Sequence, residues 1–121
     1  MIAHTMDGIT MKRLLLSLSV VAFTATAGYV SAAAPGADVF EEVCSACHGD
    51  KGQGIPGLAP PLKGSEFVKS SDVAALTAFV QKGRAGAEKK FPNYPSAMPP
   101  YTGGQGKAQA VAQYVKTEIQ K

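Results

Sequence analysis

Apolar side chains recur at helical spacing in three segments of this 121-residue chain, residues 37–46, 70–82 and 105–119. A recurrence every three or four residues places side chains on one face of a helix. The apolar positions are Val39, Phe40 and Val43 in the first segment, Val73, Leu76, Ala78, Phe79 and Val80 in the second, and Ala108, Val111, Ala112, Val115 and Ile119 in the third. The pattern predicts three helices whose apolar faces form one core.

The segments between these helices have the composition of loops. Residues 49–64 contain five glycines and three prolines, and residues 84–104 contain four prolines, which exclude a continuous helix. Ser70 or Ser71 is a suitable N-cap for the second helix, and Gly83 is a suitable residue to end it. The sequence therefore predicts an all-α fold with two long loops.

The N-terminal residues have the build of a targeting segment. Lys12 and Arg13 precede an apolar stretch, residues 14–27, and small residues follow it as cleavage sites. We predict an upstream extension at 1–10, a signal peptide at 11–34 and one exported domain at 35–121. An uncleaved anchor helix over residues 14–30 is the alternative, although this length is at the short end for spanning a bilayer.

Cys44, Cys47 and His48 form a Cys-x-x-Cys-His motif at the end of the first predicted helix. Residues three and four apart share a helical face, so these three side chains can point into one site. The motif is the attachment signature of a c-type haem, in which both cysteines form thioethers and the histidine ligates the iron. It occurs once, which predicts one haem c per chain.

Three other interpretations of the two cysteines compete with haem attachment. A thioredoxin-like pair belongs to a strand–helix unit, and no β-branched run precedes Cys44. A zinc site usually has four Cys or His ligands, whereas the chain has two of each, with His4 far upstream. A disulfide suits an exported protein but leaves the adjacent His48 unexplained.

Met98 is the only methionine after the predicted signal peptide, and it lies in a segment stiffened by prolines. A lone methionine in a loop usually fills a gap. In a haem protein whose iron needs a sixth ligand, its thioether is a candidate for that position. An iron bound by both His48 and Met98 has no open position for a substrate, so the expected function is one-electron transfer and not catalysis.

The net charge of +3, without a run of Lys or Arg, gives no indication of nucleic-acid binding. Scattered lysines are most simply a solvated surface, and a docking face for an acidic redox partner is the alternative. The lysines of that alternative are Lys51, Lys63, Lys89, Lys90 and Lys107. From their positions in the second long loop, Arg84, Tyr94 and Tyr101 are candidates to hold the haem propionates.

Together these residues resemble the class I c-type cytochromes, of the short bacterial monohaem type, over residues 36–121. Gly36 and Phe40 lie four residues apart before the haem motif, like that family's helix-contact pair, whose partner on the last helix would be Tyr114. The resemblance implies a small cytochrome c fold, with three main helices and long loops wrapped around one covalently attached haem.

The resemblance also implies roles for two residues downstream of the motif. Pro60 comes twelve residues after His48, where the family has a proline whose carbonyl accepts the Nδ1 proton of the haem histidine. Met98, fifty residues after His48, is placed like the family's axial methionine. Cofactor binding is thus expected at Cys44, Cys47, His48, Pro60 and Met98, with His48 and Met98 as the iron ligands.

The implied function is that of a periplasmic one-electron carrier with redox protein partners, whose donor and acceptor are unknown. Two alternatives remain open. The first is an electron-relay subunit of a periplasmic dehydrogenase or oxidase complex, docked to other periplasmic or membrane-bound proteins. The second is a five-coordinate haem protein that binds a small ligand.

Overall fold

The computed structural model describes residues 32–121. The predicted upstream extension at 1–10, and the predicted signal peptide at 11–34 except for its last three residues, lie outside the described residues, as does the alternative anchor helix. Among the helices that are described, none has the length and apolar character needed to cross a bilayer.

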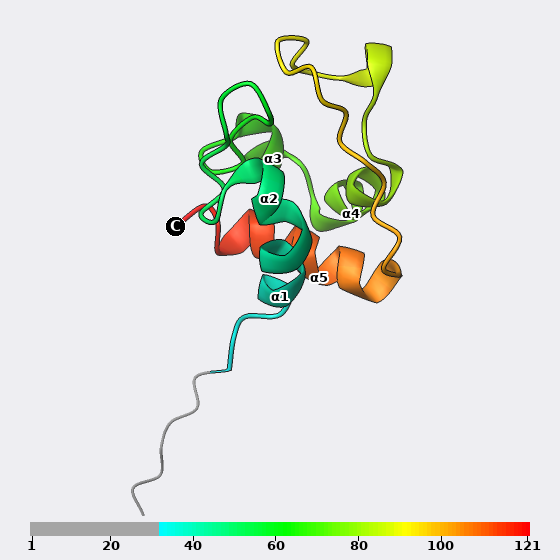
Figure 1. Ribbon diagram of the computed structural model, residues 1–121. Coiled ribbons are helices and arrows are strands. Elements are labelled where there is room, and N and C mark those ends of the chain that lie inside the picture. Colours follow the sequence, from blue (N-terminus) through cyan, green and yellow to red (C-terminus); the bar gives the residue numbers. More distant parts are fainter. Residues whose placement is uncertain (1–31) are drawn as a thin grey trace, which may run out of the picture. The chain divides into compact units, whose positions relative to one another are not determined.

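The described chain is helical, and its only β-pairing is two isolated bridges, which confirms the all-α fold and the small cytochrome c architecture (Figure 1). In chain order its elements are α1 (Ala37–Val39), η1 (Phe40–Cys44), α2 (Ser45–His48), α3 (Glu66–Ser70), α4 (Val73–Lys82), η2 (Gly86–Glu88) and α5 (Gln105–Thr117). The three predicted helices correspond to the run from α1 to α2, to α4 and to α5.

The first helical run contains one turn of π-helix, η1, in which the Ser45 N–H donates to the Phe40 carbonyl. A π turn spans one more residue than an α turn, so it shifts the phase of the side chains that follow. Val43 is 49% exposed and does not join the buried stripe of Val39 and Phe40, because it lines the cavity described below.

The helix α3 was not predicted, and its presence moves the start of α4. Ser65 caps α3, its hydroxyl accepting from Val68 N at 3.4 Å, and Ser70 is the last residue of that helix. The cap of α4 is Asp72, whose carboxylate accepts from Ala75 N at 2.7 Å. The prediction of Ser70 or Ser71 as this cap was wrong, because both serines belong to the end of α3 and an acidic cap at Asp72 suits the helix dipole.

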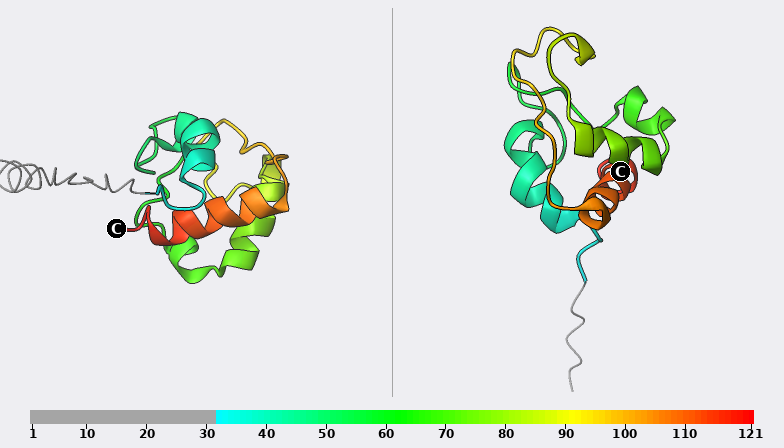
Figure 2. Two further views of the ribbon diagram at one scale, coloured as in Figure 1. Left: turned by 90° about the horizontal axis from the view of Figure 1, so that it is seen from below. Right: turned by 90° about the vertical axis from the view of Figure 1, so that its right-hand side faces the viewer.

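The core lies around α5, which runs across the molecule between the first helical run and α4 (Figure 2). Gly36, at φ +87°, lets the first run approach α5 so closely that a Cβ there would collide with the backbone of Ala110 and Val111. The rings of Phe40 and Tyr114 have centroids 5.6 Å apart. The predicted contact of Gly36 and Phe40 with the last helix is thus confirmed.

On α4 the buried face differs from the prediction at one position. Ala78 is exposed, and Thr77 is buried instead, with its hydroxyl donating to the Val73 carbonyl at 2.7 Å. This internal hydrogen bond lets a polar side chain occupy a core position without an unsatisfied donor. Leu76 packs with Val68 and Ala112 in the second of two core clusters.

The loop at 49–64 is held in one conformation by backbone hydrogen bonds, which its glycine- and proline-rich composition does not predict. Gly54 N donates to the His48 carbonyl at 2.7 Å, and Leu62 N donates to the Gly52 carbonyl at 2.8 Å. The side chain of Gln120 holds its far end, donating to the Leu62 carbonyl at 3.0 Å. The loop therefore returns to the end of α2 in a fixed conformation.

Candidate functional site

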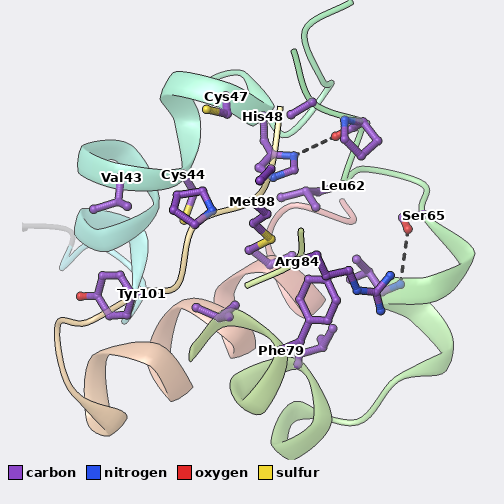
Figure 3. A pocket seen from close by; sticks show the side chains of 18 of the residues that line it. Val43, Cys44, Cys47, His48, Leu62, Ser65, Phe79, Arg84, Met98 and Tyr101 are labelled. Carbon is purple, nitrogen blue, oxygen red and sulfur yellow. Dashed lines mark hydrogen bonds between the residues drawn. The ribbon is translucent and has the colours of Figure 1, made fainter. Parts of the chain in front are cut away.

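A cavity of about 490 Å³ opens between the haem motif, α4, α5 and the loop before α5 (Figure 3). This volume is in the range of sites for small molecules and cofactors. Most of its wall is apolar, including Leu62, Val68, Leu76, Phe79, Val111 and Val115. The cavity also brings together four residues predicted to hold the cofactor, Cys44, Cys47, His48 and Met98, with Pro60 beside them.

The ring of His48 is buried, and its Nδ1 lies 2.8 Å from the Pro60 carbonyl oxygen. A carbonyl can only accept, so Nδ1 carries the proton and donates it. The other ring nitrogen, Nε2, then keeps its lone pair, which is the form of histidine that binds a metal. This is the contact that the resemblance implied for Pro60.

Burial lowers the pKa of His48 below its ordinary value, and the hydrogen bond to Pro60 partly offsets that shift. Desolvation penalises the charged imidazolium, so the folded protein favours a neutral ring. A neutral imidazole with a free Nε2 has the protonation state that an axial ligand needs.

The thiols of Cys44 and Cys47 both line the cavity and are not joined to each other. Burial, with a smaller contribution from neighbouring Cys47, raises the pKa of Cys44 to about 11. Reactive dithiols have lowered pKa values, so this environment is unlike that of a thioredoxin-type pair. In the described part of the chain, no three or more His, Cys, Asp or Glu side chains are grouped as metal ligands, which leaves zinc without its usual ligand set.

Met98 reaches the cavity from the loop before α5, and the backbone around it is held on two sides. It pairs with Arg84 in an isolated bridge, in which each N–H donates to the other's carbonyl at 2.9 Å. Gly83, at φ +68°, packs directly against the backbone from Met98 to Pro100. Figure 3 shows the side chains of His48 and Met98 projecting into the same space from different segments.

One end of the cavity is cationic. Arg84, Lys89 and Lys90 belong to its lining, and the lining includes no Asp or Glu among the described residues. The Arg84 guanidinium lies 4.0 Å from the ring centroid of Phe79 and 4.9 Å from that of Phe67. Stacking of this kind holds a guanidinium in place against an apolar wall.

Tyr94 and Tyr101 also line the cavity, and Tyr101 lies across it from Arg84 (Figure 3). All three residues predicted as propionate partners, including Arg84, are therefore in the wall of one cavity. Sequence reasoning missed Phe67, the aromatic platform for Arg84 and for Lys90, whose Nζ lies 5.1 Å from the same ring centroid. Nothing in the spacing of Phe67 and Lys90 signals this contact, because it depends on how the loop folds back.

The lysines predicted as an alternative docking face do not form one set. Lys51, Lys63, Lys90 and Lys107 are exposed. Lys89 is partly buried and donates from Nζ to the Tyr94 carbonyl at 2.6 Å and the Pro95 carbonyl at 3.2 Å. Its ammonium group is thus engaged inside the loop and is not part of a free docking surface.

The residues of this cavity fit a haem c. The thiols of Cys44 and Cys47 and the free Nε2 of His48 line one wall of the cavity, and the thioether of Met98 enters from the loop before α5. The side chains between them are mostly apolar. Haem is an apolar macrocycle with two carboxylates, and the cavity offers cations, while none of the described residues that line it is acidic. The donor set and the charge of the cavity therefore both suit this cofactor.

Comparison with known proteins gives a consistent match. The family described as cytochrome C oxidase, cbb3-type, subunit III, matches residues 31–115. The cbb3-type cytochrome c oxidase subunit CcoP of Azospirillum sp. (strain B510) is 44% identical over 59 residues, which cover 44% of this chain and 20% of that protein. CcoP of Rhodobacter capsulatus is 32% identical over 84 residues, covering 69% of this chain and 28% of that protein.

A second kind of relative is the cytochrome c subunit of a quinone alcohol dehydrogenase from Gluconacetobacter polyoxogenes. It is 29% identical over 72 residues, which cover 60% of this chain and 15% of that protein. The chain thus spans less than a third of the length of each of these relatives.

Proposed function

This chain belongs to the family of cytochrome c oxidase, cbb3-type, subunit III, and from that membership we propose that it is an electron-relay cytochrome in a bacterial oxidase or dehydrogenase complex. Membership confirms the predicted c-type cytochrome, an electron-transfer protein whose cofactor is covalently bound haem c. The relay role is supported by relatives that are named as subunits of such complexes. The sequence predicted a free carrier with a relay subunit as the alternative, and the names of the relatives support the relay subunit better.

The observation that carries the proposal at the level of residues is the bond from His48 Nδ1 to the Pro60 carbonyl, 2.8 Å long. It leaves Nε2 as the ligand atom and fixes the orientation of the ring. Cys44 and Cys47 are the residues that would hold the haem through thioethers, and His48 and Met98 are the residues that would bind its iron. Arg84 is the residue that would hold its carboxylates, and Tyr94 and Tyr101 are further hydroxyl donors in the wall of the cavity.

When bound, the haem supplies an iron that exchanges one electron between its Fe(III) and Fe(II) states. Met98 offers a soft thioether, which favours the reduced state and raises the reduction potential. The Pro60 carbonyl makes the His48 ring more basic by accepting a hydrogen bond from Nδ1. The apolar wall excludes water, and this opposes the more highly charged oxidised centre.

The proposal includes export. The residues predicted as a signal peptide, 11–34, would direct the chain to the periplasm, where the partner subunits of a relay would be met. The mass of the mature protein purified from its own host tests this point. A mature N-terminus near residue 35 is the expected result, and retention of residues 14–27 would indicate an anchor instead.

An optical spectrum of the purified protein, oxidised and reduced, is the experiment that tests the haem assignment. A low-spin c-type spectrum with a near-infrared sulfur-to-iron band is expected. Ready binding of carbon monoxide to the reduced protein would indicate a five-coordinate iron and refute ligation by Met98. A colourless protein whose two thiols alkylate freely would refute the haem itself.

Affinity purification of the tagged chain from mildly solubilised host cells separates a relay subunit from a free carrier. Co-purification of oxidase or dehydrogenase subunits in fixed proportion is expected. If the chain were recovered quantitatively without other subunits and with its haem spectrum intact, the relay role would be refuted and the function would be that of a free electron carrier.

A further inference from the structure

The segment from Arg84 to Met98 is a loop with a closed base and an internal brace. The base is the pair of hydrogen bonds between Arg84 and Met98, each 2.9 Å long. The brace is Lys89, whose Nζ donates to the Tyr94 carbonyl at 2.6 Å and to the Pro95 carbonyl at 3.2 Å. These two carbonyls lie four and three residues before Met98.

Lys89 lies on the outgoing limb of the loop, the part that leads away from Arg84, and this limb is attached to α4. The returning limb is the part that leads back to Met98. The 3₁₀ turn η2 ends directly before it, with Lys89 N donating to the Gly86 carbonyl at 3.3 Å. Glu88 in the same turn pairs with Lys82, the last residue of α4, at 3.0 Å. The ammonium group of Lys89 thus connects a limb fixed to α4 with the limb that carries Met98.

The returning limb has few other ways to be held. Prolines at 92, 95, 99 and 100 carry no N–H, so this stretch has fewer backbone donors for turns and bridges than an ordinary loop. A charged donor that reaches two carbonyls makes stronger hydrogen bonds than a neutral one. Lys89 therefore supplies cross-links that the backbone of this limb cannot make.

We propose that Lys89 is a positioning residue, which keeps the Met98 thioether directed into the cavity. The inference rests on the proposed function, in which Met98 is the sixth ligand of the haem iron. Without Lys89 the returning limb departs from the cavity more often, and the sixth position becomes accessible to an external ligand. The helices and the His48 side of the site are unaffected, since neither depends on the brace.

Competition with added imidazole measures this accessibility, because an external ligand binds only when Met98 leaves. The variant is Lys89→Met, and the control is Lys107→Met, which removes the same charge from a lysine outside the cavity. Lys107 is exposed on α5 and does not line the cavity. Far-ultraviolet circular dichroism of each holoprotein reports whether the fold is intact.

Loss of two charge-assisted hydrogen bonds is expected to raise the apparent imidazole affinity of Lys89→Met about tenfold or more, in proportion to the population with Met98 released. Lys107→Met should stay within about twofold of the parent protein, as expected for a surface change. Lys89→Arg retains a charged donor and should restore part of the parent affinity. If Lys89→Met loses helical content, the milder pair Lys89→Gln and Lys107→Gln is compared in the same way.

Equal imidazole affinity in the Lys89 and Lys107 variants would overturn the inference while leaving ligation by Met98 in place. A parent protein without the near-infrared sulfur-to-iron band would instead refute Met98 as a ligand, and the inference with it. The two failures are therefore distinguished before any variant is compared.

Discussion

Substitution of Gly83 by alanine tests whether the tight packing behind Met98 matters. Gly83 has φ +68° and ψ −171°, a conformation that is essentially restricted to glycine and costs another residue about 1–3 kcal/mol. A Cβ at this position would lie 2.8 Å from Pro100 N and closer still to the Met98 carbonyl oxygen. Separating these backbone segments costs about 1–3 kcal/mol more.

The sum, about 2–6 kcal/mol, is a large share of the roughly 5–15 kcal/mol that stabilises a domain. Guanidinium unfolding of the Gly83→Ala holoprotein, followed by circular dichroism, measures the lost free energy of unfolding. The near-infrared band measures whether the strain is relieved by movement of Met98 instead. Either a large loss of stability or a weakened band is expected.

Gly86→Ala is the matched control within the same loop. Gly86 has φ +55°, but a Cβ there meets no atom within 4 Å, so only the backbone strain of about 1–2 kcal/mol applies. If Gly83→Ala lost no more stability than Gly86→Ala and kept the full band, the close contact with Met98 would have no energetic consequence, and the reasoning would be refuted.

Three further predictions follow from single contacts. Met98→Ala should abolish the near-infrared band, lower the reduction potential and admit carbon monoxide to the reduced protein; an unchanged potential and band would mean that another residue is the ligand. Arg84→Gln should lower the potential measured by voltammetry, because a nearby positive charge favours the reduced iron, whereas Lys107→Gln on the exposed side of α5 should not. Lys116→Met should reduce the free energy of unfolding by about 1–2 kcal/mol in chemical denaturation with no change in potential, because its ammonium group caps the carbonyls that end α3, the nearest at 2.6 Å; equal stability would show the cap to be dispensable.

The parts of the site that the sequence could predict are those encoded by local spacing. Cys44, Cys47 and His48 are adjacent on one helix, so a pattern of five residues is enough to place them together. The faces of the first and last helices follow from the helical period, as the burial of Phe40 and Val111 confirms.

The parts that could not be predicted depend on contacts between distant segments or on small changes in backbone geometry. The π turn at η1 has no marker in composition. The helix α3 is five residues long, too short for a periodic pattern, and the Lys116 side chain that caps its end comes from α5. The bracing role of Lys89 exists only because the loop turns back on itself.

The packing of Gly36 and Phe40 against α5 also bears on the order in which the protein is assembled. The haem motif follows these residues at once, while their partners Val111 and Tyr114 are near the other end of the chain. In a chain synthesised from its N-terminus, both thiols are therefore made before the residues of α5 that bury this helix. The first helical run can pack into the domain only after α5 (Gln105–Thr117) has been synthesised.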